Sequence, residues 1–209
     1  MLAVTVAYYG AAKLGLGLTF AHAGESAIWP AAGVALAAVL LGGYELLPAV
    51  ALGAFLASVS TALPLGSVLG ITAGNTLEAL VGAALLRGIG FRGSLHRLRD
   101  VVALVALAGF ASTAVGATAG VASMLAGGAV AHSAIGLAWR EWWLGGMGGI
   151  LVCTPVLLVL AAAWPLRWPR QHRLEALAAG AVLVLASVVV LRHGGPLAYL
   201  AVPALFWTS

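Results

Sequence analysis

The sequence predicts an all-α protein, a polytopic bundle of about eight transmembrane helices. Of its 209 residues, 63% are hydrophobic and 8% are charged, and the mean hydropathy is +1.09. Because a soluble domain carries about a quarter charged residues, this chain has too few to cover a soluble core. Its apolar stretches reach the roughly 20 residues with which a helix crosses a bilayer, and they lack the alternating polarity of outer-membrane strands.

Proline and glycine mark the ends of the expected helices. These cover residues 2–20, 29–42, 46–62, 65–87, 99–126, 135–163, 173–192 and 196–209. Pro30, Pro48, Pro64 and Pro196 stand near the starts of four of them, where the missing N–H is not needed. The second and third helices are short, so they are either tilted or form a tight hairpin, and the alternative count is six or seven crossings. The last measures only about 21 Å and is expected to be incomplete.

The sixth expected helix has the clearest membrane boundaries. Trp143 and Trp164 lie 21 residues apart, a separation of about 31 Å in a helix, which matches the distance between the two interfaces of a bilayer. Pro155 lies between them and is expected to kink the helix.

Arginine clusters predict the orientation. Arg87, Arg92, Arg97 and Arg99 crowd one connection, and Arg167, Arg170 and Arg173 crowd another. Both connections fall on one side if the two helices between them form a hairpin, and the positive-inside rule makes that side cytoplasmic. We therefore expect a multi-pass membrane protein with both termini in the cytoplasm. The basic pI of about 9.8 follows from this topology and from contact with anionic lipid, so no nucleic-acid partner is expected.

The first helix raises the question of a signal peptide. It ends in Ala21-His22-Ala23, which is similar to a signal-peptidase site. However, no positive region precedes the apolar stretch and Lys13 interrupts it, so an uncleaved helix is expected. One membrane domain then fills residues 1–209, with no soluble effector domain.

Four sequence blocks carry a resemblance to a known family. They begin at Trp29 (WPAAGVALA), Leu52 (LGAFLA), Gly74 (GNTLEALVG) and Trp142 (WWLG), with TPVL following from Thr154. In this order they resemble the MASE1 family of bacterial membrane-associated sensor domains over nearly the whole chain. The resemblance implies a sensory module that precedes a cytoplasmic histidine kinase, diguanylate cyclase or phosphodiesterase, in two-component or cyclic-di-GMP signalling. Family members often carry an acid soon after WWLG, where this chain has GMGG.

A first candidate site is a row of small residues interrupted by one acid: Gly66, Gly70, Gly74, Glu78 and Gly82. Four-residue spacing places them near one helix face, and a carboxylate facing lipid would be unfavourable. We therefore expect Glu78 to face protein or a polar cavity, with Asn75 one turn away. Lys13 lies at a similar estimated depth, which predicts a Lys13–Glu78 pair that anchors a ligand or switches the helices. The alternatives are a static ion pair, and a Lys13 that reaches to the interface.

A second candidate site lies near the outer surface. Trp29, Glu141, Trp142 and Trp143 bring indoles and a carboxylate near the same membrane boundary, together with His22, Glu25 and His132. This mixture suits a small-molecule pocket, and the alternative is a set of interfacial anchors. No spacing places two histidines on one helix face and there is a single cysteine, so neither a metal nor a cofactor is expected.

These features favour sensing over catalysis. No nucleophile stands near a base, and no phosphate-binding loop or pair of acids within one helix is present, so an enzyme is not expected. We expect a sensory domain that detects a small ligand, the membrane state or a partner, and that signals through its C-terminal helix to a cytoplasmic effector. The alternatives are a substrate-binding subunit or transporter-like carrier, and a scaffold that recruits a partner through residues 87–99. The sequence leaves a homodimer open.

Overall fold

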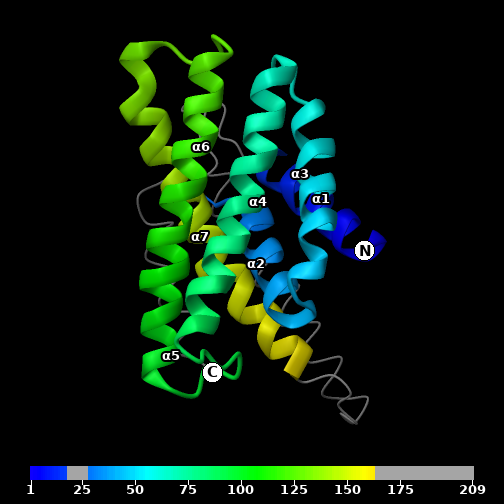
Figure 1. Cartoon of the computed structure of the whole chain (residues 1–209), viewed down its shortest axis with the longest axis vertical. Helices are drawn as coiled ribbons and strands as arrows, with labels where there is room; N and C mark the ends of the chain where they lie inside the picture. The colour runs from blue at the N-terminus through cyan, green and yellow to red at the C-terminus, as the bar shows by residue number, and fades with distance from the viewer. Residues whose placement is uncertain (18–27, 163–209) are drawn as a thin grey trace. The chain divides into compact units, whose positions relative to one another are not determined.

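The computed structural model describes residues 1–17 and 28–162, and all regular elements in these ranges are helical (Figure 1). They are α1 (Leu2–Gly17), α2 (Pro30–Gly42), η1 (Tyr44–Leu46), α3 (Leu47–Val59), α4 (Leu65–Gly88), α5 (Leu98–Ala103), η2 (Leu104–Ser112), α6 (Thr113–Ala126), η3 (His132–Ala134) and α7 (Ile135–Ala162). The all-α prediction is confirmed for this part of the chain. The expected helices at 173–192 and 196–209 lie outside it, so the count of eight is not confirmed.

Three helical spans are long and apolar enough to cross a membrane: Leu65–Gly88, Leu98–Ala126 and His132–Ala162. These correspond to three of the expected crossings, with Pro155 inside α7 as predicted. By contrast, α2 and α3 have 13 residues each, about 20 Å of helix, which is less than the hydrocarbon thickness. The chain turns between them at Gly43, whose φ of +90° suits glycine.

The helices are arranged around α4. It packs against α2, α3 and α6, while α7 packs against α2 and α6, and α1 packs against α2 and α3. The α3–α4 and α6–α7 connections lie at one end of the molecule, and the α2–α3 and α4–α5 connections lie at the other (Figure 1). This alternation is the one that successive membrane crossings require.

The glycine row of α4 is a packing face. A Cβ added at Gly70 would collide with Ser123, and one at Gly74 would lie 3.0 Å from the Cβ of Ala119 on α6. A Cβ added at Gly82 would lie 2.9 Å from the Oγ of Ser112. These residues let α4 and the α5–α6 span approach closely, as small residues do between membrane helices. Gly66 differs from the prediction because it is exposed, with open space where a Cβ would be.

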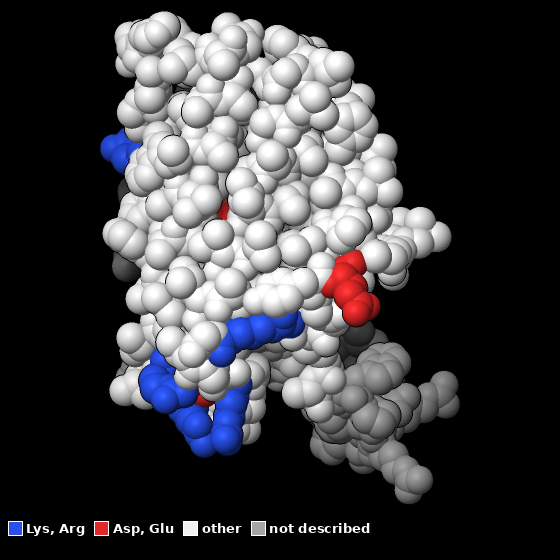
Figure 2. Space-filling view, in the orientation of Figure 1, with Lys and Arg blue, Asp and Glu red and all other residues white. Residues whose placement is uncertain are grey.

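The surface drawn in Figure 2 is mostly uncharged, and basic side chains gather at the end where α4 and α5 connect. Arg92, Arg97 and Arg99 are exposed there. Arg87 is half-buried: its Nη2 donates to the Val39 carbonyl at 2.6 Å, and its guanidinium lies 4.4 Å from the centre of the Tyr44 ring. Arg87 thus satisfies a carbonyl at the end of α2, in addition to marking the basic side of the molecule.

A π-helix interrupts the long span Leu98–Ala126. η2 extends from Leu104 to Ser112 and connects α5 directly to α6. A π-helix of this length is rare, and short π segments concentrate at functional sites. The sequence pattern of this apolar stretch did not predict it.

Candidate functional site

A cavity of about 520 Å³ lies among α1, α3, α4, α7 and the residue that precedes α2. Its polar and aromatic lining comprises Tyr8, Trp29, Ser58, Thr61, Asn75, Glu141 and Trp142, and the remainder is mainly small or aliphatic side chains. Four of these seven residues were candidates from the sequence: Trp29, Asn75, Glu141 and Trp142. The other three candidates, Lys13, Glu78 and Trp143, do not line the cavity.

Trp29 is fixed by close contacts with glycines on two helices. Its backbone N–H donates to the carbonyl of Gly145 at 2.8 Å. Its ring covers Gly15, where an added Cβ would lie only 2.8 Å from Cε3, and its side chain is hydrogen-bonded to Tyr8. Proline at position 30 then starts α2, since its fixed φ suits the first turn and its missing N–H needs no partner.

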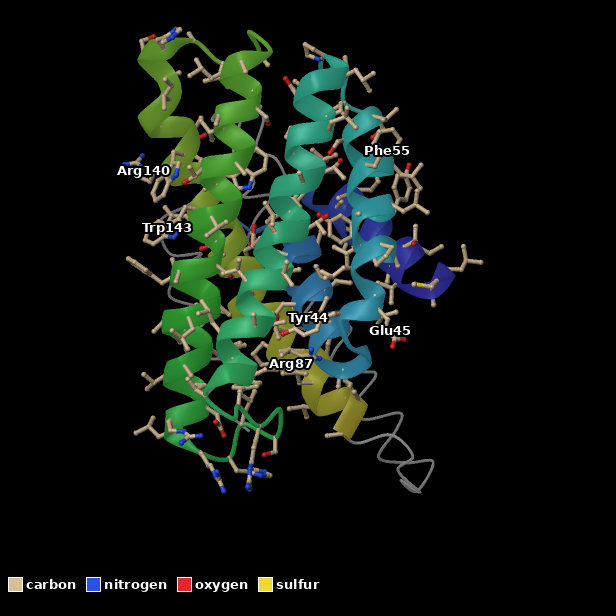
Figure 3. All side chains as sticks on the ribbon, viewed as in Figure 1. Tyr44, Glu45, Phe55, Arg87, Arg140 and Trp143 are labelled. Carbon is tan, nitrogen blue, oxygen red and sulfur yellow. The ribbon has the colours of Figure 1, made fainter. Side chains whose placement is uncertain are left out.

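Trp142 and Trp143 are consecutive in the sequence, but their side chains lie in different surroundings. The Trp142 ring lines the cavity and lies over Gly120, where an added Cβ would be 2.6 Å from the ring. Trp143 instead packs edge-on against Phe110, with ring centroids 4.8 Å apart, and its Nε1 donates to the Phe110 carbonyl at 3.0 Å. Successive helical residues point about 100° apart, so only Trp142 reaches the cavity. Figure 3 shows Trp143 on the outer side of the bundle.

Glu78 lies one helical turn beyond Asn75 and is 3% exposed, so the expectation that it faces protein is confirmed. A Cβ at Gly116 would collide with its Oε2, and a Cβ at Gly146 would lie 3.2 Å from its Oε1. Within the described part of the chain, this Oε1 has no hydrogen-bond partner. Burial of a carboxyl oxygen without a hydrogen-bond partner is unfavourable, most of all when the group is charged.

The predicted Lys13–Glu78 contact is not formed. Lys13 Nζ donates to Ser60 Oγ at the end of α3 and lies 5.6 Å from the centre of the Tyr9 ring. Lys13 therefore reaches the C-terminal end of α3, which Ser60 caps.

The sequence interpretation missed Tyr8 and the glycines that make room for the site. Tyr8 is 1% exposed and lines the cavity, but an aromatic residue in a membrane helix gives no distinguishing signal. Gly116 and Gly120 seat Glu78 and Trp142, and their four-residue spacing matches that of the α4 row. Because small residues at this spacing on two helices favour close packing, the α4 row and the Gly116–Gly120 pair together could have predicted that Glu78 lies against α6.

The arrangement suits binding of a small molecule. Three aromatic rings supply apolar surface, and Asn75 and Glu141 supply polar groups that orient a ligand, as in preformed ligand sites. His132 is exposed in η3 and does not line the cavity. His22 and Glu25 lie outside the described residues.

The whole chain was compared with known proteins. A model of the MASE1 family matches residues 1–209. Neither a curated protein nor a solved structure matches.

Proposed function

The chain belongs to the MASE1 family of membrane-associated sensor domains, and from this premise we propose that its cavity detects a small molecule in the bacterial inner membrane. The observation that carries the proposal is that Trp29, Asn75 and Trp142, on separate elements, line a single cavity. A ligand held by all three would favour one arrangement of α2, α4 and α7 over others. Such differential binding is what a ligand needs to shift a conformational equilibrium.

In this proposal, α7 transmits the conformational response to ligand binding away from the cavity. This helix carries Glu141 and Trp142 at the cavity, and Trp143 hydrogen-bonded to the π-helix η2. It continues to Ala162 at the opposite end of the bundle. In the proposal both termini are cytoplasmic, and the C-terminal segment 196–209 passes the signal to an output such as a histidine kinase or diguanylate cyclase.

A binding screen on a matched pair of variants tests the proposal. Ala138 lines the cavity, whereas its neighbour Leu137 is 49% exposed. The 209-residue chain in lipid nanodiscs is screened against small molecules by thermal unfolding, and co-purified compounds are identified by mass spectrometry. We expect a compound that raises the Tm of the native chain and of Leu137→Phe, but not of Ala138→Phe, because the added ring fills the cavity.

Two results would contradict this proposal. A compound that stabilises Ala138→Phe as strongly as Leu137→Phe binds elsewhere. Uptake of the bound compound into proteoliposomes would favour the carrier over the sensor, since a sensor binds its ligand without moving it across the bilayer.

A further inference from the structure

We infer that the cavity binds an uncharged molecule with an apolar body and a polar end that both donates and accepts hydrogen bonds, such as a carboxamide. The inference rests on the proposed function, because it names the class of ligand that the same cavity takes. It depends on two polar side chains that line the cavity, Ser58 of α3 and Asn75 of α4. Ser58 is 8% exposed and Asn75 is 7% exposed, so both are more than nine-tenths buried.

These two side chains differ from the other buried hydroxyl and amide groups. Within residues 1–17 and 28–162, seven Ser, Thr and Asn residues are buried. Five of them donate to a backbone carbonyl and do not line the cavity: Thr5, Ser67, Ser112, Thr113 and Thr154. The other two, Ser58 and Asn75, make no side-chain hydrogen bond in this part of the chain. The unpartnered groups are therefore the ones that face the cavity.

The lack of a hydrogen bond at Ser58 is unusual for a hydroxyl in an apolar helix. Such hydroxyls commonly donate to a carbonyl three or four residues earlier in the same helix, as Ser112 does to Ala108 at 2.7 Å. Ser58 lies near the end of α3, where the carbonyl of Ala54 offers the same geometry. Because burial of a polar group without a partner is unfavourable, Ser58 and Asn75 are suited to bind polar groups of a molecule in the cavity.

The charges of the lining favour an uncharged ligand. Its described residues include no lysine, arginine or histidine, so none of them would neutralise a buried anion. Its one acid, Glu141, already takes part in an interaction within the chain, so it does not call for a cation. A neutral polar group needs no opposite charge, since hydrogen bonds alone satisfy it.

The remaining lining suits the apolar body of such a ligand. The rings of Tyr8, Trp29 and Trp142 come from three elements and meet aliphatic and alanine side chains around the cavity. A few polar groups within a mainly apolar lining are typical of small-molecule sites, whose volumes of roughly 300 to 1,000 Å³ include the 520 Å³ found here. An amide and a hydroxyl each donate and accept hydrogen bonds, and a carboxamide offers the complementary pair of groups.

The main rival is water, which can satisfy the same hydroxyl and amide groups. Water gains nothing from the three rings, however, whereas a ligand with an apolar body buries them and replaces the hydrogen bonds of the water that it displaces. The two alternatives differ in a measurable way. If water serves Ser58 and Asn75 while a ligand lies elsewhere in the cavity, removal of these polar groups leaves ligand affinity unchanged.

The test uses four probes of one shape that differ only at the polar end. They are 2-phenylacetamide, the anion phenylacetate, the cation 2-phenylacetamidinium and the apolar isobutylbenzene. Binding to the 209-residue chain in nanodiscs is measured by titration calorimetry and thermal unfolding, and the signal from empty nanodiscs is subtracted. We expect 2-phenylacetamide to bind about ten-fold more tightly than the other three probes, because two hydrogen bonds of ordinary strength are added.

Two buried serines provide the matched variants. Ser58→Ala should reduce the affinity for 2-phenylacetamide by about three-fold or more and should not reduce the affinity for isobutylbenzene. Ser112→Ala, at a hydroxyl that already donates to Ala108, should change neither affinity. Asn75→Leu should act as Ser58→Ala does, and if it does not fold, Ser58→Ala alone makes the comparison. Ser58→Ala should also leave the Tm of the ligand-free chain unlowered, and a clear fall would show that the hydroxyl has a partner within the fold, which overturns the inference.

The outcomes separate the two proposals. Equal or tighter binding of isobutylbenzene, or a preference for either ion, overturns the inference but leaves a small-molecule sensor. Unchanged amide affinity in the Ser58 and Asn75 variants overturns it in favour of water. If no probe binds, the ligand from the library screen decides: an uncharged ligand weakened by Ser58→Ala supports the inference, and any other overturns it. If neither experiment yields a ligand, the proposed function fails as well.

Discussion

The carboxylate of Glu78 rests so closely on Gly116 that a single methyl group there would collide with Oε2. The contact joins the middle of α4 to α6, and it determines where the acid can lie. Glycine at this position leaves room for the carboxylate, and the carboxylate fills a space that would otherwise be a void between two membrane helices.

This contact predicts a specific coupling. Gly116→Ala should lower the Tm in detergent micelles, because overpacking typically costs about 1–3 kcal/mol. In a Glu78→Ala background, the same change should be nearly neutral, because the colliding atoms are gone. A double-mutant cycle should therefore give a coupling free energy above ~0.5 kcal/mol. Gly10→Ala, where a Cβ meets open space, is the control and should not lower the Tm.

The glycine row predicts an unequal pair of variants. Gly74→Leu should be strongly destabilising, because a Cβ there already lies 3.0 Å from Ala119. Leu77→Ala should change the free energy of unfolding by less than ~1 kcal/mol, since Leu77 is 43% exposed and surface substitutions usually have small effects. Thermal unfolding of the two variants checks this ranking. Equal Tm values would contradict the packing role of the row.

The separation of Lys13 from Glu78 also has a thermodynamic consequence. Effects of Lys13→Met and Glu78→Gln on the free energy of unfolding should add to within ~0.5 kcal/mol, as they do for residues without shared partners. Lys13→Met and Ser60→Ala should not add, because Nζ and Oγ are hydrogen-bonded to each other. Rescue of Lys13→Met by Glu78→Gln would show that the two charges interact after all.

Arg87 should contribute more to stability than its exposed neighbours. Arg87→Ala removes the hydrogen bonds to the carbonyls of Val39 and Leu40 and the contact with Tyr44. A hydrogen bond from a charged donor contributes about 1.5–3 kcal/mol, so a clear loss of Tm is expected. Arg92→Ala, at an exposed site in the same basic segment, should leave the Tm nearly unchanged. A similar loss of Tm in both variants would mean that the effect comes from the change in net charge and not from the contacts of Arg87.

Gly120 provides a test of the cavity wall. Gly120→Ala should displace the Trp142 ring, because the new methyl group would lie within 2.6 Å of it. We expect a change in tryptophan emission and a weaker affinity for any cavity ligand. Gly136→Ala in the same helix as Trp142 meets nothing within 4 Å and should alter neither property. Unchanged emission for Gly120→Ala would mean that the ring does not rest on this glycine.

The sequence was sufficient for the fold class and for most helix boundaries, because proline, glycine and apolar length act locally. The six expected helices between residues 2 and 163 all correspond to helical spans. Burial of Glu78 also followed from the sequence, since exposure of a carboxylate to lipid is so unfavourable. These predictions needed no knowledge of which helices are neighbours.

Predictions that depended on which helices and side chains are in contact were less successful. The Lys13–Glu78 pairing assumed equal depth, whereas Lys13 is hydrogen-bonded to Ser60 at the end of α3. Trp143 was grouped with Trp142, although only the rotation of α7 decides which indole reaches the cavity. The π-helix from Leu104 to Ser112 was not predicted because its apolar residues give no periodic signal that separates it from an α-helix.

The hydrogen bond from the Trp29 N–H to the Gly145 carbonyl constrains how the bundle can move. It connects the main chains of two segments that are far apart in sequence, and both residues also line the cavity. A piston-like slide of α7 along α2 would have to break this bond. Tilting or swivelling about that point would preserve it, so the bond would act as a pivot for any change of shape in this membrane domain.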